Sequence, residues 1–210
     1  MQVKILKTNI FLTGQIQVGK STLIYKLLAS DEFANADIRG FRTLNRGKDV
    51  YLMDAMADVE DCTEENICGE RILEGAGNMP TPYLDVFNNL GTSLLGDIDD
   101  ADIVVMDELG FLESEAYVFR ERIVEILDSE KPVLGVLKKK PTEFLDSVRD
   151  RDDVEVIEIT SENRLEQLEY VKKLPIWENV IKKSKDKNKK GKPRGFYGKD
   201  IKTKMGVCLA

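Results

Sequence analysis

The stretch FLTGQIQVGKSTLIYKLL, residues 11–28, decides the fold of this chain. It contains Gly14, four further residues and then the run Gly19-Lys20-Ser21, which is the pattern GxxxxGK[ST]. An apolar strand pattern precedes it, and apolar residues at helical spacing follow it. In that context the backbone N–H groups of the loop, at the positive end of a helix, are expected to bind phosphate. The sequence therefore predicts a phosphate-binding loop between the first strand and the first helix.

The residues of this loop have separate expected tasks. Lys20 can reach the β- and γ-phosphates of a nucleotide, and the hydroxyl of Ser21 can hold Mg²⁺. Gln15 and Gln17 stand where such loops often carry glycine, and they are tolerated if their φ angles are not positive or if the strain is absorbed. A chance match would leave Lys20 without a purpose at the buried end of a sheet. The predicted nucleotide-binding residues of this segment are Gly14, Gln15, Ile16, Gln17, Val18, Gly19, Lys20, Ser21 and Thr22.

The segment IVVMDE, residues 103–108, is the second element that carries chemistry. Its four apolar residues place Asp107 at the carboxyl end of a central strand, where ligands bind in open α/β sheets. We expect Asp107 to hold Mg²⁺ and Glu108 to orient and deprotonate an attacking water molecule. In the alternative reading, the two carboxylates are an ordinary strand end before a helix. Such a pair also hints that another strand separates the strand of Asp107 from the strand of the loop.

Predicted strands and helices alternate along most of the chain. GFRT (40–43) and DVYLMDA (49–55), separated by the turn signal NRG, predict an antiparallel hairpin after the first helix. Further strands are predicted at residues 101–110, 132–137 and 154–160. Ser114 and Thr142 are the expected N-caps of the two helices between them. This alternation is typical of an α/β fold with a mainly parallel sheet.

The charge distribution divides the chain into two parts. The formal net charge is -7, but from residue 182 onward 11 Lys and Arg stand against two acidic residues, Asp186 and Asp200, which gives that segment +9 and leaves -16 on the remainder. We expect one domain over residues 1–180 and a basic, flexible tail over residues 181–210. Such a tail can attract nucleic acid or an acidic partner, although a solvated tail is the simpler interpretation.

Composition excludes several kinds of chemistry and location. The 210 residues include no histidine, so Ser-His-Asp catalysis, Cys-His catalysis and His-ligated metal sites are excluded. No apolar run is long enough to span a bilayer, and the first residues do not resemble a secretion signal. The three cysteines form no CxxC pair. A cytoplasmic protein, reduced and without membrane contact, is therefore expected.

Five segments resemble those of the THEP1-type nucleoside-triphosphatase family, in the same order and at similar spacing. They are FLTGQIQVGKSTL, RGFRT, ADIVVMDELGFLES, KPVLGVLK and VIEITSENRLEQL. Together they cover roughly residues 8–170. The loop alone is generic among nucleotide-binding proteins. The succession of DELGFLE, PVLGV and T-x-E-N-R is much more particular and carries most of the resemblance.

The resemblance implies a fold and an activity. The fold is the three-layer sandwich of the P-loop NTPases, similar to RecA. The activity is hydrolysis of ATP, GTP and other nucleoside triphosphates to the diphosphate and phosphate, with Mg²⁺. The nucleotide-binding segments of the family correspond to Gly14–Ser21 and Ile103–Gly110. The chain departs from the family at Gln17, where glycine is usual, and in the hairpin GFRTLNRG, whose turn is shorter.

Four arginines are candidates for a cation beside the γ-phosphate, namely Arg39, Arg42, Arg46 and Arg164. Arg42 and Arg46 belong to the predicted hairpin, which can fold over the site or present a solvated face. Arg164 follows the last strand, near the expected position of the base. It is a candidate for nucleotide binding by stacking, or for a structural salt bridge.

Two other functions fit the same fold. A small-molecule or nucleotide kinase needs an acceptor pocket and usually an arginine-rich lid. Residues 57–82 are acidic and their only arginine is Arg71, which speaks against such a lid. A nucleotide-dependent switch would recruit a partner in one nucleotide state. The sequence contains no NKxD motif, the guanine reader of GTPases. We expect a monomer that binds a nucleoside triphosphate, with Lys20 and Glu108 as catalytic residues.

Overall fold

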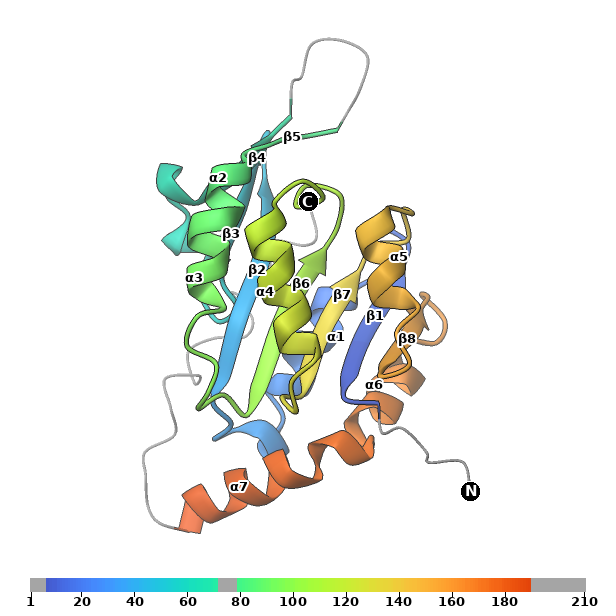
Figure 1. Ribbon diagram of the computed structural model, residues 1–210. Helices are drawn as coiled ribbons and strands as arrows, with labels where there is room; N and C mark the ends of the chain where they lie inside the picture. The colour runs from blue at the N-terminus through green and yellow to red at the C-terminus, as the bar shows by residue number, and fades with distance from the viewer. Residues whose placement is uncertain (1–6, 72–78, 190–210) are drawn as a thin grey trace.

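The computed structural model describes residues 7–71 and 79–189. Its centre is an eight-stranded sheet with the order β5-β4-β3-β2-β6-β7-β1-β8, and helices lie on both faces (Figure 1). The strands are β1 Asn9–Gly14, β2 Ile38–Arg46, β3 Asp49–Asp54, β4 Ile67–Glu70, β5 Thr81–Pro82, β6 Ile103–Leu109, β7 Val133–Leu137 and β8 Val154–Ile159. The five strands from β2 to β8 in this order are parallel, and β3, β4 and β5 extend that sheet in antiparallel pairing. The predicted α/β fold with a mainly parallel sheet is confirmed.

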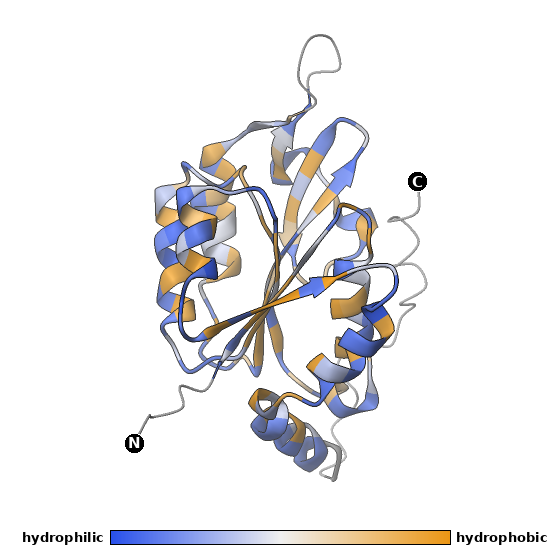
Figure 2. Ribbon diagram, turned by 90° about the vertical axis from the view of Figure 1, so that its right-hand side faces the viewer, coloured by the Kyte–Doolittle hydropathy of each residue, from blue (hydrophilic) through white to orange (hydrophobic). Residues whose placement is uncertain are grey.

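Each face of the sheet packs against its own helices. The helices are α1 Lys20–Leu28, α2 Leu84–Val86, α3 Thr92–Leu94, α4 Tyr117–Leu127, α5 Glu143–Arg149, α6 Arg164–Lys172 and α7 Glu178–Lys189. A π-helical stretch, Phe87–Gly91, joins α2 to α3. Hydrophobic residues of α4 and α5 pack on one face, whereas those of α1 and α6 pack on the other. Figure 2 shows the central strands largely in hydrophobic colours, as expected for strands covered on both sides.

The sheet order brings the two predicted chemical segments to one edge. β7 lies between β1, which leads into the loop, and β6, which carries the acidic pair. The predicted strand between the strand of the loop and the strand of the acidic pair is therefore present, and it is β7. Because β1, β7 and β6 are parallel, their carboxyl ends converge on the same edge of the sheet.

The hairpin and one of the two helix caps are also as predicted. β2 and β3 pair antiparallel around the turn at residues 46–49, and β2 joins the sheet through β6. The hydroxyl of Thr142 accepts a hydrogen bond of 3.1 Å from the Leu145 N–H, so Thr142 is the N-cap of α5. The hairpin is thus an integral part of the sheet rather than a flap over it.

The prediction for Ser114 is wrong. α4 begins at Tyr117 with Ala116 at its N-cap, and the Ser114 hydroxyl is buried with no hydrogen-bond partner among the described residues. The segment after β6 first forms a tight turn, in which the Ala116 N–H donates to the Glu113 carbonyl at 2.9 Å. This turn delays the helix beyond the residue that the sequence pattern favours.

The first part of the predicted tail is helical. Residues 181–189 belong to α7, which lies across the amino ends of the parallel strands (Figure 1). Ser184 is buried, and the Nζ atoms of Lys183 and Lys187 lie 3.3 Å and 2.9 Å from the carboxylate of Asp102, just before β6. The basic run predicts a solvated segment because it contains few apolar residues; Val180 and Ile181, just before it, pack against the core. Residues 190–210 lie outside the described part of the chain.

No helix in residues 7–71 or 79–189 is long and apolar enough to cross a membrane.

Candidate nucleotide-binding site

The loop begins where β1 ends, at Gly14. This residue has a φ of 143°, and a Cβ atom there would lie 2.3 Å from the Ile159 carbonyl oxygen at the end of β8. Only glycine fits so close to the neighbouring strand. The first glycine of the motif therefore serves the close approach of β1 to β8, which sets the direction in which the loop leaves the sheet.

Gln17 adopts a left-handed backbone conformation. Its φ is 62°, and its side chain is exposed. The sequence condition that this residue avoid positive φ is not met, so the loop absorbs a strain of about 1–2 kcal/mol. Glycine is the residue expected at this position because it adopts a positive φ without strain. The side chain points to solvent, and the backbone N–H groups remain the loop's phosphate-binding groups.

Lys20 is held inside the loop by main-chain oxygens. Its Nζ atom donates hydrogen bonds to the carbonyls of Gly14 at 3.1 Å and Gln15 at 2.7 Å, and the residue is buried. Burial lowers the pKa of this ammonium group, while the charges of Glu108 and Asp107 act in the opposite direction. The only cation within the motif is thus curled back on the loop, at the place where phosphate oxygens are expected.

Ser21 and Asp107 meet at the amino end of α1. The Ser21 hydroxyl donates a hydrogen bond of 2.9 Å to Oδ1 of Asp107. Burial, and next the charge of Glu108, raises the pKa of Asp107 to about 6, although the Ser21 hydrogen bond and the charge of Arg42 lower it in part. A hydroxyl and a carboxylate beside a phosphate loop are the hard oxygen donors that Mg²⁺ prefers. The two residues therefore fit the metal predicted for them.

Arg42 is brought close to Asp107, and the solvated-face interpretation is wrong for it. In the register of β2 and β6, Arg42 lies opposite Asp107. Its guanidinium is 4.9 Å from the centre of the Tyr25 ring, the residue is 5% exposed, and its Nε has no hydrogen-bond partner in the described structure. Burial and then the charge of Asp107 raise the pKa of the Tyr25 hydroxyl well above its usual value. Arg46, by contrast, is exposed at the hairpin turn.

Glu108 has a partner that sequence reasoning missed. Its Oε1 lies 2.7 Å from Nζ of Lys138, the first residue after β7. Glu113 was also missed. Its buried carboxylate accepts a hydrogen bond from the Gly110 N–H, and burial raises its pKa to about 7. Only the strand order could have indicated Lys138. Because β7 lies between β1 and β6, the residue that follows β7 must lie at the same edge of the sheet as the loop and the acidic pair.

Comparison with known proteins identifies the family. The family described as NTPase matches residues 9–171. The nucleoside-triphosphatase THEP1 of Thermotoga petrophila is 30% identical over 187 residues, which are 81% of this chain and 96% of that protein. This chain belongs to the THEP1-type nucleoside-triphosphatase family. THEP1 of Methanocaldococcus jannaschii is 28% identical over 167 residues, 78% of this chain and 94% of that protein.

The fold agrees with that family. The crystal structure of THEP1 from Aquifex aeolicus superposes with a TM-score of 0.62 at 22% identity, covering 78% of this chain and 96% of that one. The three-layer P-loop NTPase architecture implied by the resemblance is confirmed.

The THEP1-type motif T-x-E-N-R forms a rigid turn beside the loop. The Thr160 N–H donates to the side-chain oxygen of Asn163 at 2.8 Å, and the Asn163 N–H donates back to the Thr160 hydroxyl at 3.2 Å. Arg164 begins α6, and its Nη1 lies 3.6 Å from the point a Cβ on Gly19 would occupy. Within the described residues Arg164 forms no ion pair, so it stands free over the loop.

Arg39 is not part of this site. Its guanidinium pairs with Asp37 at 2.6 Å and approaches Asp97 at 3.9 Å. It lies opposite Val104 in the sheet, three residues before Asp107 along β6 and toward the amino end of that strand. Of the four arginines proposed from sequence, Arg42 and Arg164 are therefore the ones beside the loop and the acidic pair.

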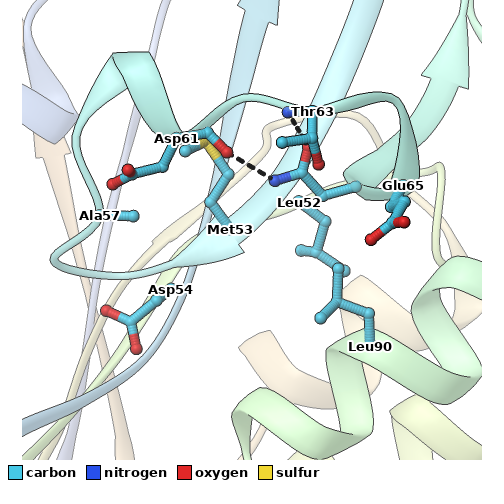
Figure 3. Close-up of a pocket in the computed structure, with 9 residues that line it drawn as sticks. Leu52, Met53, Asp54, Ala57, Asp61, Thr63, Glu65 and Leu90 are labelled. Carbon is cyan, nitrogen blue, oxygen red and sulfur yellow. Dashed lines mark hydrogen bonds between the residues drawn. The ribbon is translucent and has the colours of Figure 1, made fainter.

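A separate cavity does not suit a triphosphate. It has a volume of about 470 Å³ and lies between residues 57–66 and Leu90 (Figure 3). Asp54, Asp61 and Glu65 line it, together with Leu52 and Met53. Phosphate groups in this cavity would be repelled by the carboxylates. The loop avoids this repulsion, because it offers backbone N–H donors and the ammonium group of Lys20.

Proposed function

We propose that this chain hydrolyses nucleoside triphosphates, including ATP and GTP, to the diphosphate and phosphate, with Mg²⁺ as cofactor. The observation that carries the proposal is the arrangement of Lys20, Ser21, Asp107 and Glu108. One strand separates β1, which leads into the loop, from β6, which carries the acidic pair, and the Ser21 hydroxyl is hydrogen-bonded to Asp107. The relatives are named nucleoside-triphosphatases, which supports the hydrolysis of nucleoside triphosphates.

The loop residues would bind the phosphates. Backbone N–H groups of residues 15–19 and the positive end of α1 stabilise the negative charge of the β- and γ-phosphates. Lys20 leaves the two carbonyls that hold it and bonds to phosphate oxygens instead. Arg164, which stands over Gly19, would contact the nucleotide on the side of the base or the α-phosphate. Mg²⁺, held by Ser21 and Asp107, would neutralise charge on the phosphates.

Glu108 would accept a proton from the attacking water. The water oxygen forms a bond to the γ-phosphorus, the bond from that phosphorus to the β–γ bridging oxygen breaks, and the diphosphate leaves with the electron pair. The proton of the water passes to the Glu108 carboxylate. Since little covalent chemistry falls to the protein, positioning and charge stabilisation account for most of the rate.

A phosphate-release panel tests this proposal. ATP, GTP, CTP and UTP are each incubated with the protein and Mg²⁺, with no acceptor added. We expect phosphate from several of them, with loss of turnover in Glu108→Gln and loss of binding in Lys20→Ala. A kinase would release little phosphate until an acceptor is supplied. Normal turnover by Glu108→Gln would refute the role of Glu108 as proton acceptor.

A further inference from the structure

The ion pair between Glu108 and Lys138 poses a chemical problem for the proposed reaction. The Lys138 ammonium lies 2.7 Å from Oε1 of Glu108, and the two side chains are 30% and 22% exposed. Oε1 of Glu108 is therefore already occupied by a cationic hydrogen-bond donor. An attacking water molecule that is to hydrogen-bond to this oxygen has to displace the Lys138 ammonium first.

Lys138 is fixed at the edge of the sheet where the terminal phosphate is expected. It follows β7, the strand between β1 and β6, and its N–H donates to the Leu109 carbonyl at 3.0 Å. The Arg149 guanidinium donates to its carbonyl at 3.1 Å. The backbone of Lys138 thus has no freedom to leave the edge of the sheet that carries the loop and the acidic pair.

The side chain of Lys138, unlike its backbone, is partly exposed, so its ammonium group can change partner. Its stem runs along Gly110, where an added Cβ would lie 3.0 Å from Cδ, and its Nζ is 5.2 Å from the centre of the Phe111 ring. The charges of Glu108 and of Lys138 both act on Lys20, so the three groups share one electrostatic environment. A lysine is a flexible point charge with three donors, which suits an exchange between two anions.

We propose that Lys138 exchanges its partner on nucleotide binding. It holds Glu108 in the nucleotide-free protein and bonds to the terminal phosphate of a bound triphosphate, and this transfer frees Glu108 to accept the proton of water. The inference rests on the proposed function. A diphosphate has no terminal γ-phosphate, so Lys138 stays on Glu108 when the product is bound. The chain then distinguishes triphosphate from diphosphate through this one side chain.

The next residue along the chain supplies a matched control. Lys139 has the same charge and acts on Lys20 in the same direction as Lys138. Its Nζ, however, lies 2.5 Å from Oε1 of Glu158, on β8, and both side chains are about half exposed. Lys139→Met therefore removes an equal charge from the neighbourhood without removing the proposed phosphate contact.

The test measures the equilibrium affinities of the full chain for ATP and ADP with Mg²⁺ in a Glu108→Gln background. We expect this background to stop turnover. It also removes the charge that would repel the phosphate once Lys138 is lost, so a change in affinity reports the contact of Lys138 itself. Lys138→Met, Lys138→Gln, Lys138→Arg and Lys139→Met are compared by calorimetry, and thermal unfolding verifies that each variant is folded. Using both Met and Gln at position 138 keeps the test decisive if one of them fails to fold.

We expect Lys138→Met and Lys138→Gln to weaken ATP binding about tenfold or more, and ADP binding by less than about twofold. Lys138→Arg should retain most of the ATP affinity, and Lys139→Met should leave the ratio of the two affinities unchanged. Unchanged or tighter ATP binding without Lys138, or an equal loss for ATP and ADP, would overturn the exchange. Lys20→Met in the same background separates the two claims, because undiminished ATP affinity there would refute the proposed function itself.

Discussion

The Ser21 hydroxyl donates a hydrogen bond of 2.9 Å to Oδ1 of Asp107, a residue 86 positions later in the chain. This contact ties the amino end of α1 to the carboxyl end of β6. The sequence motif supplies the first residue and a buried strand supplies the second, and the parallel order of β1, β7 and β6 brings them together. The two proposed Mg²⁺ ligands are therefore in mutual contact within the folded chain.

Asp107→Asn should separate the charge of this site from its shape. The amide oxygen can still accept the Ser21 hydrogen bond, so we expect little loss of folding free energy. Without the carboxylate charge, phosphate release at saturating Mg²⁺ should fall about a hundredfold or more. Asp54→Asn, at the exposed end of β3, is the matched control and should keep normal activity. Equal activity of Asp107→Asn and the unaltered protein would exclude Asp107 as a metal ligand.

Gln17 offers a test of backbone strain. Because its φ is 62°, Gln17→Gly should raise the free energy of unfolding by up to about 1 kcal/mol and leave nucleotide affinity nearly unchanged. Gln17→Val should be destabilising, because a branched side chain fits this conformation poorly. Urea unfolding of the two variants provides the measurement. A loss of stability in Gln17→Gly, with no effect in Gln17→Val, would show that the loop does not carry this strain.

Glu113 should make stability depend on pH. Burial raises its pKa to about 7 from an ordinary 4.5, so the folded chain holds a proton that the unfolded chain releases at lower pH. The stabilisation is complete below pH 4.5 and is lost as the pH rises through 7. Between pH 5 and pH 8 we expect the unfolding free energy to fall, relative to Glu113→Gln, by up to about 3 kcal/mol.

Urea unfolding at the two pH values measures this difference. Glu121→Gln, an exposed substitution on α4, is the control and should follow the unaltered protein at both values. If Glu113→Gln shows the same pH dependence as the unaltered protein, the Glu113 carboxyl does not titrate in this range.

Asp102 should anchor α7. It accepts hydrogen bonds from the Asp37 N–H at 2.9 Å and from Lys183 and Lys187. We expect Asp102→Asn to lower the unfolding free energy by about 2 kcal/mol. The loss arises because the buried amide that replaces the carboxylate still needs hydrogen-bond partners, and it stays moderate because the two lysines are partly exposed. Trp177, the only tryptophan of the chain, is buried beside α7 and reports the change by fluorescence.

The control for α7 is Lys185→Met on the exposed side of that helix. It should change stability by less than about 0.5 kcal/mol. Phosphate release should be unaffected by either substitution, because α7 lies at the opposite end of the strands from the loop. A loss of catalysis in Asp102→Asn at unchanged stability would contradict this separation.

Much of the fold and part of the site could be predicted from sequence. The motif Gly14–Ser21 and the apolar run before Asp107 are local patterns with a known structural context, and both were placed correctly. The intervening strand was inferred from the acidic pair. Ser114 was misplaced because a turn and a helix start share the same short polar residues. α7 was missed because its contacts, such as the one to Asp102, come from distant parts of the chain.

Contacts between distant residues also explain what was missed within the site. The pairing of Lys138 with Glu108 and the burial of Arg42 beside Tyr25 depend on strand order and register. Neither leaves a pattern in the local sequence. Gln17 is the reverse case, because the family's motif alone predicts a glycine at this position and the backbone there has the left-handed φ that favours glycine.

A crystal structure of Glu108→Gln with ATP and Mg²⁺ tests the central claim most directly. We predict that the loop of residues 14–21 surrounds the β- and γ-phosphates, with Lys20 turned from the Gly14 and Gln15 carbonyls onto phosphate oxygens. Mg²⁺ should be held at Ser21 and Asp107, directly or through water, and residue 108 should face the γ-phosphorus across a water molecule. A triphosphate bound elsewhere, or residue 108 turned away from its terminal phosphorus, would contradict the account.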